Sequence, residues 1–283
     1  MLRSRRSFWR FCGDTQEDKA FARPETCIGL TGEQITSDRI SNVRRVTLNS
    51  NNYYIKQYCV GGKHVRRFLG RSRAQGEWQN LEYFAELQIP VTPLVAYGRH
   101  KVGKTHLELL VTAAVEDSSD LATLAQQKPE RFANRSWTLS VMRQVAEYTR
   151  RLHADNFVHW DLKWRNILVQ GDADPKIYFF DCPLGRRWYG GLQRRGAIKD
   201  LGCLDSVARL VLTRTQRLRF LLLYRQEEKL TPGAKCQIRQ IDGFLRARAQ
   251  RRAKKQAKKV KSTQLTSGQP DARVGHDSES PRC

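Results

Sequence analysis

A short polar segment near the middle of the chain carries residue types that could transfer a phosphoryl group. Between His159 and Asn166 the sequence reads HWDLKWRN, so Asp161 precedes Asn166 by five positions. Another aspartate, Asp181, follows fifteen residues after Asn166. Phosphoryl transfer needs a carboxylate to orient the attacking hydroxyl and accept its proton, and oxygen ligands to hold Mg²⁺ on the nucleotide phosphates. Asp161 fits the first role, and Asn166 with Asp181 fits the second.

The residues between Asn166 and Asp181 predict a β-hairpin. NILVQ and KIYFFD are two short β-rich runs, and the intervening residues 171–175 (GDADP) are typical of a turn. In a hairpin the start of the first strand lies beside the end of the second. We therefore expect Asn166 and Asp181 to meet at one end of the paired strands.

A phosphate anchor is expected upstream of this segment. Lys56 lies in YYIKQY, a β-rich run in which Tyr54 and Tyr58 share its face. The following residues 71–87 predict a helix that carries Glu77 among apolar residues. A carboxylate would keep the lysine oriented, so Glu77 is the best candidate for its partner, with Glu82 as the alternative.

The remaining pattern predicts strands followed by helices. Residues 46–58 read as a hairpin around Asn49–Asn52, and further strands are expected at 91–97 and 107–115. A polar link follows, and then a helix that Ser136 can cap. Residues 200–223 and 237–244 are also expected to be helical. This order favours a two-lobed α+β protein.

Composition limits the possible partners and compartment. The 283-residue chain has a formal net charge of +23, so it is expected to bind nucleic acid, an anionic membrane face or a phosphorylated substrate. No apolar run is long enough to cross a bilayer, and the basic N-terminus lacks the apolar region of a secretory signal. The seven scattered cysteines argue against a disulfide framework or zinc site and favour a reducing compartment.

Taken together, these features resemble the protein-kinase-like superfamily. A strand lysine, a helix glutamate, HxDLxxxxN and a later aspartate occur in the order found there. The sequence is more closely similar to the lipopolysaccharide core kinases, which phosphorylate Kdo or heptose. The segments that carry this likeness are YYIKQY, GEWQNLEYFAELQIPVTPLVAYG, FVHWDLKWRNILV and KDLGCLDSVARL, and the likeness extends over roughly residues 35–245.

The resemblance implies a kinase fold with a small β-rich N-lobe holding one helix, and a mainly helical C-lobe. We assign residues 1–30 to an N-terminal extension, 31–115 to the N-lobe, 116–245 to the C-lobe and 246–283 to a basic, disordered tail.

The resemblance also implies roles for individual residues, with ATP and Mg²⁺ as cofactors. Asp161 would be the catalytic base, and Lys163 would neutralise the transferring phosphoryl group. Asn166 and Asp181 would hold the metal, and Lys56 would contact the nucleotide phosphates. Asp200, expected at the start of a helix, resembles the aspartate that braces the catalytic loop, and His159 is expected to be structural.

The chain departs from the protein-kinase pattern at three points. No GxGxxG precedes the strand lysine, so a glycine-free turn around Ser41 and Asn42 is expected to cover the phosphates. Trp160 stands where many protein kinases have an arginine, and Cys182-Pro183 follows Asp181 in place of Phe-Gly. These departures favour a kinase of small molecules or glycolipids.

Basic residues mark two candidate binding segments. One lies between Asp181 and Asp200, where the superfamily places its acceptor, and comprises Arg186, Arg187, Arg194, Arg195 and Lys199. The other, Arg246–Lys261, holds nine Lys or Arg and no acid. It is either a solvated charge run or a contact with an anionic membrane surface, where Phe244 and Leu245 could seat a helix at the lipid.

The leading hypothesis is an ATP-dependent kinase for Kdo or heptose of the lipopolysaccharide inner core, bound peripherally to the cytoplasmic face of a bacterial inner membrane. Its acceptor would be an acidic glycolipid. One alternative is an atypical Ser/Thr or Tyr protein kinase, or a ribosome-associated one. The other is a catalytically dead nucleic-acid-binding module, although no recognisable nucleic-acid-binding motif is present.

Overall fold

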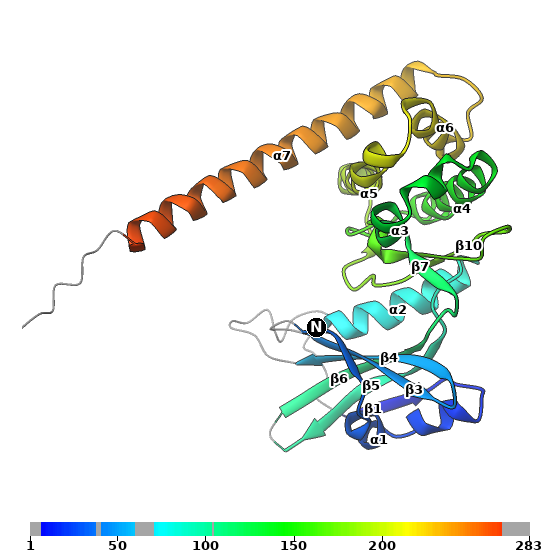
Figure 1. Ribbon diagram of the computed structural model, residues 1–283, viewed down its shortest axis with the longest axis vertical. Helices are drawn as coiled ribbons and strands as arrows, with labels where there is room; N and C mark the ends of the chain where they lie inside the picture. The colour runs from blue at the N-terminus through cyan, green and yellow to red at the C-terminus, as the bar shows by residue number, and fades with distance from the viewer. Residues whose placement is uncertain (1–6, 38–40, 60–70, 104, 268–283) are drawn as a thin grey trace, which may run out of the picture.

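A β-sheet and a group of helices form the two layers of the computed structural model, which describes residues 7–37, 41–59, 71–103 and 105–267 (Figure 1). The sheet has six strands in the order β1-β5-β6-β4-β3-β2, and its neighbouring strands are antiparallel. The bounds of these strands are β1 Phe8–Phe11, β2 Glu33–Ser37, β3 Ser41–Leu48, β4 Asn51–Cys59, β5 Leu94–Val102 and β6 Thr105–Ala113. The predicted α+β, two-lobed kinase-like fold is confirmed.

The predicted hairpin between β3 and β4 is present, with Leu48 paired to Asn51. Its two turn residues, Asn49 and Ser50, have φ angles of 46° and 73°. Both therefore adopt the left-handed conformation that two-residue hairpin turns require, and asparagine tolerates it better than most residues. This turn fixes the register of β4 and, with it, the face on which each β4 side chain lies.

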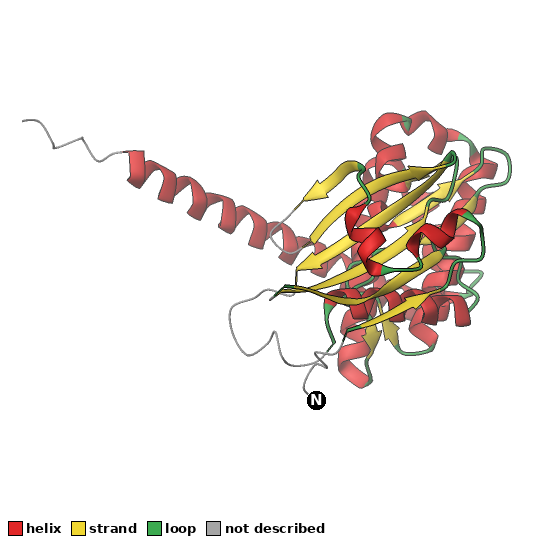
Figure 2. Ribbon diagram, turned by 90° about the horizontal axis from the view of Figure 1, so that it is seen from below, coloured by secondary structure: helices red, strands yellow, loops and turns green. Residues whose placement is uncertain are grey.

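The N-terminal segment is part of the sheet layer, contrary to the expected extension over residues 1–30. Strand β1 pairs with β5 along its whole length. The 3₁₀ helix η1 (Glu17–Phe21) and helix α1 (Pro24–Gly29) lie on the sheet face turned toward the viewer in Figure 2. Phe21 and Cys27 are fully buried there against Ile55. Strand β1 has no buried side chain, and the buried apolar residues of η1 and α1 are Phe21 and Cys27 alone, so the segment shows no periodicity.

Helix α2 (Arg73–Glu86) covers the opposite face of the sheet and separates it from the helical lobe (Figure 1). Its N-terminus is capped by the Ser72 side chain, which accepts a hydrogen bond from the backbone N–H of Gln75. Trp78 and Leu81 pack against Tyr97 of β5. The helix expected over residues 71–87 is therefore confirmed to within two residues at each end.

The helical lobe contains more regular structure than its polar sequence predicted. The expected link after β6 holds strand β7 (Ser118–Asp120), helix α3 (Leu121–Gln127) and the 3₁₀ helix η3 (Pro129–Ala133). Helix α4 (Arg135–Ala154) is capped by Asn134, and not by Ser136 as expected. The expected helix at 200–223 is two helices, α5 (Gly190–Val211) and α6 (Arg214–Arg225), divided where Thr213 caps α6.

Helix α7 (Pro232–Ser267) replaces the expected disordered tail as far as Ser267, and residues 268–283 lie outside the described part of the chain. Its last half projects beyond the body of the protein (Figure 1). The projecting half contains Ala, Lys, Arg and Gln and lacks Gly and Pro. This composition favours a helix, although the run of charges by itself predicts disorder. Phe244 packs on Gly202 of α5, and Leu245 packs near Leu201. These two residues therefore anchor α7 to the lobe and are not available to a lipid.

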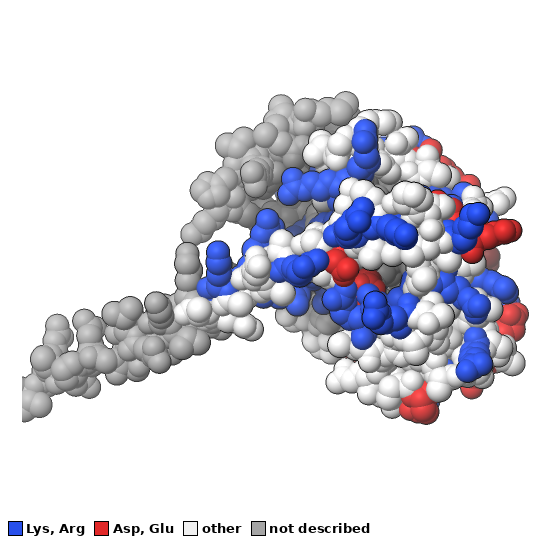
Figure 3. Space-filling view, turned by 90° about the horizontal axis from the view of Figure 1, so that it is seen from above, with Lys and Arg blue, Asp and Glu red and all other residues white. Residues whose placement is uncertain are grey.

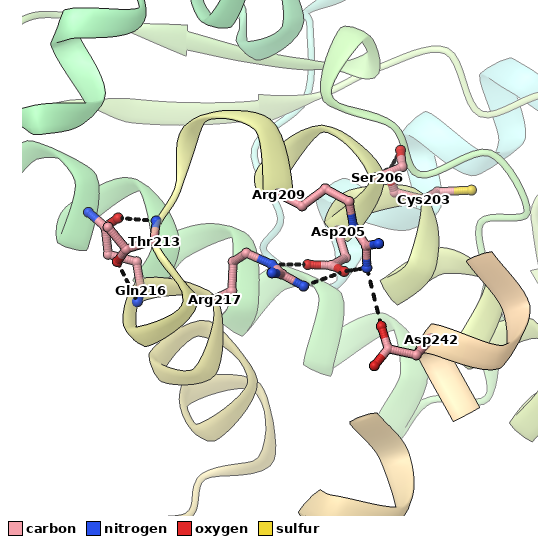
Figure 4. A network of polar contacts seen from close by, with 8 residues as sticks. All are labelled: Cys203, Asp205, Ser206, Arg209, Thr213, Gln216, Arg217 and Asp242. Carbon is pink, nitrogen blue, oxygen red and sulfur yellow. Dashed lines mark hydrogen bonds and ion pairs between the residues drawn. The ribbon is translucent and has the colours of Figure 1, made fainter. Parts of the chain in front are cut away.

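A network of ion pairs ties α5 to its neighbours (Figure 4). Asp205 of α5 accepts two hydrogen bonds from Arg217 of α6, at 2.6 and 2.9 Å, and one from Arg209 at 2.7 Å. Arg209 also reaches Asp242 of α7 at 3.3 Å. The network lines a largely apolar cavity of about 550 Å³ between α4, α5, α6 and α7. None of the predicted catalytic residues lines this cavity.

We expect Asp205→Asn to lower the free energy of unfolding by about 1–2 kcal/mol, because two half-buried guanidinium groups lose their shared carboxylate. The matched change Asp242→Asn should cost no more than about 0.5 kcal/mol, because that pair is single and more exposed. Urea denaturation followed by circular dichroism measures both values. Equal losses in the two variants would show that Asp205 does not hold the helices together.

Candidate active site

The segment that carries Asp161 is a loop closed by its own side chains. It runs from β8 (Phe157–Val158) to the 3₁₀ helix η4 (Trp164–Asn166). The side-chain amide of Asn166 donates to the carbonyl oxygen of Asp161 at 2.9 Å. This bond uses the amide nitrogen, so the amide oxygen of Asn166 is the atom left to face a ligand.

The hairpin predicted after Asn166 brings that residue to the segment containing Asp181. Strands β9 (Ile167–Gln170) and β10 (Lys176–Phe179) are antiparallel, with Ile167 opposite Phe179. The backbone N–H of Phe180 donates to the carbonyl oxygen of Asn166 at 3.2 Å. The expected meeting of the two predicted metal ligands at one end of the hairpin is therefore confirmed at the level of the backbone.

The predicted pair of Lys56 and Glu77 forms between the sheet and α2. Lys56 Nζ lies 3.0 Å from Glu77 Oε2, and it also contacts the carboxylate of Asp181. The alternative partner, Glu82, instead accepts a hydrogen bond from Tyr97 at 2.9 Å. Lysine 56 therefore links three elements that are distant in sequence: β4, α2 and the segment after β10.

Strand alternation explains why this pair forms. Tyr53 and Ile55 face α1, whereas Lys56 and Tyr58 lie on the face covered by α2. The hydroxyl of Tyr58 donates to Glu77 Oε2, the same oxygen that Lys56 approaches. The alternation of the strand predicts Tyr58 on this face but does not indicate its contact with Glu77. A tyrosine two positions after the strand lysine was the available signal.

Electrostatics keeps Lys56 charged. Burial alone would lower the pKa of Lys56, but the carboxylates of Glu77 and Asp181 raise it above its ordinary value. Burial likewise pushes the pKa of Glu77 upward, and the Lys56 ammonium and the Tyr58 hydroxyl oppose that rise. Burial and the nearby Glu77 charge raise the pKa of Tyr58, so its hydroxyl keeps its proton and remains a donor.

Asp161 carries its own cation. Lys163 Nζ lies 2.5 Å from Asp161 Oδ1, and a guanidinium nitrogen of Arg165 lies 3.8 Å from Oδ2. Burial raises the pKa of Asp161, but the hydrogen bond and charge of Lys163 outweigh it and hold the pKa below its usual range. The Asp161 carboxylate is therefore ionised and remains an acceptor.

Asp200 braces this loop from the helical lobe. Its fully buried carboxylate accepts a hydrogen bond from the backbone N–H of His159 at 2.7 Å. It lies in the middle of α5, and not at a helix start as expected. Neither ring nitrogen of buried His159 has a hydrogen-bond partner among the described residues, and burial lowers its pKa. His159 is therefore neutral and fills space next to Phe84, 6.0 Å away between ring centroids.

A buried asparagine of α2, which is not among the site residues predicted from the sequence, positions the segment after Asp181. Asn80 donates to the carbonyl oxygens of Cys182 at 2.6 Å and Gly185 at 2.9 Å. It follows Glu77 by three positions, so both polar side chains project from one face of α2. A polar residue at a core position of a predicted helix was the signal.

Ser41 and Asn42 are strand residues and not the turn expected to cover a phosphate. Both lie in β3, opposite Tyr58 and Gln57 of β4. The amide of Asn42 exchanges hydrogen bonds with the amide of Gln34, each at 3.0 Å. Residues 38–40, which precede β3, lie outside the described part of the chain.

In the basic segment after Asp181, one arginine is paired with a carboxylate and the other cations are not. Arg187 forms an ion pair with Asp155 at 2.7 Å. Arg186 lies over the ring of Trp188, 5.1 Å from its centroid, and Lys199 lies 4.9 Å from the ring centroid of Trp160. Arg194 and Arg195 are exposed on the first turns of α5. Among the described residues no carboxylate forms an ion pair with Arg186, Arg194, Arg195 or Lys199.

The oxygen donors suit a magnesium ion better than a transition metal. Within the described residues no three His, Cys, Asp or Glu side chains form a metal-binding group. One carboxylate, of Asp181, and one amide, of Asn166, lie at the same end of the hairpin. Mg²⁺ is commonly held by one or two protein oxygens, with water and substrate phosphates completing its shell, so this set fits it.

The fold and this arrangement of residues are those of a kinase. The chain belongs to the lipopolysaccharide kinase (Kdo/WaaP) family, whose pattern its residues 32–224 match, and members of this family are kinases. Among solved structures, the chain is similar to WaaP in complex with acyl carrier protein, with a TM-score of 0.60 and 22% sequence identity. The match covers 82% of this chain and 91% of the WaaP chain. No curated protein sequence matches. The resemblance to the lipopolysaccharide core kinases is confirmed.

We expect Lys163→Met to raise the pKa of Asp161, because burial persists while the main stabilising cation is removed. In the wild type the carboxylate stays ionised at pH values below the ordinary pKa of aspartate. In the variant it should take up its proton at a higher pH. Carbon-13 NMR titration of the Asp161 carboxyl measures the shift. Arg165→Met is the matched control and should raise the pKa less, because Arg165 is farther away and 63% exposed. An unchanged titration in Lys163→Met would contradict the assignment.

Proposed function

We propose that this protein transfers the γ-phosphoryl group of ATP, with Mg²⁺, to a sugar hydroxyl of Kdo or heptose in the lipopolysaccharide inner core. The observation that carries the proposal is the joint position of Lys56, Glu77 and Asp181 beside a braced loop that presents Asp161. The nucleotide would bind between the β-rich lobe, ending near residue 115, and the helical lobe. Family membership supports lipopolysaccharide as the source of the acceptor.

Each residue has a role that follows from its surroundings. Asp161 orients the acceptor hydroxyl and takes its proton, which its ionised state permits. Lys163, at 2.5 Å from that carboxylate, neutralises negative charge on the transferring group. Asn166 and Asp181 would hold Mg²⁺, which supplies further charge compensation when bound.

Lys56 would change partners when the nucleotide binds. Its ammonium contacts both Glu77 and Asp181. A phosphate oxygen and the metal would compete for this ammonium and for the Asp181 carboxylate. The bond from Tyr58 keeps Glu77 in place, so Lys56 can leave Asp181 while it stays oriented on Glu77. The strand lysine then contacts the nucleotide phosphates.

The acceptor is inferred to be acidic because most of the basic side chains between Asp181 and Asp200 have no carboxylate partner among the described residues. Arg186, Arg194, Arg195 and Lys199 could bind a carboxylate or phosphate of the core sugars, and arginine does so with two parallel hydrogen bonds. Arg187 is already paired with Asp155 and is left out of this group.

The proposed location is the cytoplasmic face of a bacterial inner membrane. In the described part of the chain no helix is long and apolar enough to cross a bilayer. Side chains 251–257 of α7 are exposed and include Arg251, Arg252, Lys254 and Lys255. Near an anionic surface each such residue contributes on the order of 1 kcal/mol. We therefore propose that the segment Arg246–Lys261 attracts the enzyme to the membrane electrostatically.

A direct assay with lipopolysaccharide core acceptor and radiolabelled ATP tests the function. Asp161→Asn should lower turnover by about 10²–10⁴-fold, because it removes the proton acceptor, and leave nucleotide affinity nearly unchanged. Asp181→Asn should weaken nucleotide binding in the presence of Mg²⁺ as well as turnover. Full activity of Asp161→Asn would refute its role. Labelling of generic proteins in place of the core acceptor would favour a protein kinase.

The contribution of the free arginines can be measured separately. Changing Arg194 and Arg195 together to Glu should raise the acceptor KM by about tenfold or more and leave the KM for ATP unchanged, because charge reversal repels an acidic acceptor. Changing the exposed Arg135 and Arg143 of α4 to Glu alters the net charge equally and serves as the control. If both double variants behave alike, the effect is one of overall charge and these arginines do not touch the acceptor.

A further inference from the structure

A short stretch beside the active site exposes large apolar side chains. Leu184, Tyr189 and Leu192 are 47%, 69% and 51% exposed. They lie within nine consecutive residues, whereas the other large exposed apolar side chains of the described chain are distributed over the rest of the sequence. Apolar surface that a soluble fold leaves in one place commonly marks a contact with a partner.

The surroundings of these side chains are basic. No Asp or Glu occurs from Cys182 to Lys199, which we call the mouth segment. Its exposed arginines include Arg186, Arg194 and Arg195. Apolar side chains interleaved with cations suit the interface of an anionic bilayer, where headgroups are negative and the acyl boundary is apolar.

The mouth segment is held in a fixed position next to the catalytic loop. Strand β11 (Arg186–Arg187) pairs with β8, the strand that leads into the loop of Asp161. The carbonyl oxygen of Gly185 accepts hydrogen bonds from Asn80 and Arg71 of the α2 region. The exposed apolar groups therefore lie on a supported segment next to the catalytic loop.

The basic helix α7 leaves the body near this segment. Arg248 of α7 donates a hydrogen bond to the sulfur of Cys203 in α5 at 3.5 Å. Cys203 lies one helical turn after Lys199, and the ammonium of Lys199 lies over the ring of Trp160 in the catalytic loop. Lys and Arg gather on the face from which α7 projects (Figure 3). The mouth segment and α7 thus approach the same side of α5 through Lys199 and Arg248.

We infer that the mouth segment docks on an anionic lipid bilayer, with Leu184, Tyr189 and Leu192 entering the interface and the neighbouring arginines facing the negative headgroups and the anionic sugars carried there. This inference rests on the proposed function, because a lipid-borne acceptor has its sugars next to that interface. Docking at the mouth presents Asp161 to the acceptor without removing the lipid from the membrane. The projecting part of α7 adds attraction that is electrostatic alone, whereas the mouth segment adds an apolar contribution.

The difference between the two contributions allows a test with the full-length protein. Co-sedimentation is measured on vesicles of phosphatidylethanolamine and phosphatidylglycerol at low salt and near 1 M salt, where the Debye length falls to about 3 Å. The wild type should retain part of its binding at high salt. In the triple variant Leu184→Ser, Tyr189→Ser, Leu192→Ser, the vesicle binding that remains at high salt should be about tenfold weaker than in the wild type. Replacing Arg251, Arg252, Lys254 and Lys255 by Gln should reduce only the binding at low salt.

A matched control changes Val102 and Leu210 to Ser, because these residues are 44% and 78% exposed elsewhere on the molecule. This control should bind vesicles like the wild type. The triple variant should phosphorylate acceptor embedded in vesicles about tenfold more slowly than the wild type, and a deacylated, soluble acceptor at the same rate.

The outcomes separate the two proposals. Complete release of the wild type by salt, or equal vesicle binding by the triple variant, overturns the docking surface. The docking surface is also overturned if the protein binds only vesicles of neutral lipid and the triple variant binds them as well as the wild type does. If the wild type phosphorylates neither acceptor, the proposed function fails, while the vesicle measurements still decide whether the mouth segment binds lipid.

Discussion

The buried carboxylate of Glu77 is the constraint on which the rest of the structure depends. At 4% exposure it must be paired, because an unpaired buried charge costs several kcal/mol. Lys56 from β4 and the hydroxyl of Tyr58 supply that pairing, and this fixes α2 against one face of the sheet. The same lysine reaches Asp181, so satisfying one carboxylate also sets the distance between the β-rich lobe and the catalytic residues of the helical lobe.

The parts of this arrangement that local chemistry determines could be predicted from the sequence. The turn at Asn49–Ser50 and the hairpin after Asn166 each follow from a few neighbouring residues. Strand alternation then placed Lys56 on the correct face. The metal, base and acceptor roles of the site residues stay predictions.

The remaining parts depend on contacts that local patterns do not contain. Strand β1 is defined by its pairing with β5, some ninety residues away, and α3 has a single buried turn in a polar context. In α7 the charge run suggested disorder, although its composition favours a helix and Phe244 packs on Gly202. Ser41 and Asn42 belong to β3 and not to the expected turn, because strand boundaries are the feature that local sequence patterns determine least well.

The uneven distribution of charge also follows from the proposed reaction. A nucleotide and an acidic acceptor must come within bonding distance, and two unit charges 4 Å apart repel by about 4 kcal/mol at an effective dielectric of 20. The carboxylates of the site are already neutralised internally, Glu77 by Lys56 and Asp161 by Lys163. Lys56 and Lys163 must serve both these carboxylates and the nucleotide, so further cations are needed to offset the acidic acceptor. The proposed function assigns that role to the basic side chains of the mouth segment that have no carboxylate partner among the described residues. A chain that carries +23 can supply them because it places no Asp or Glu between Cys182 and Lys199.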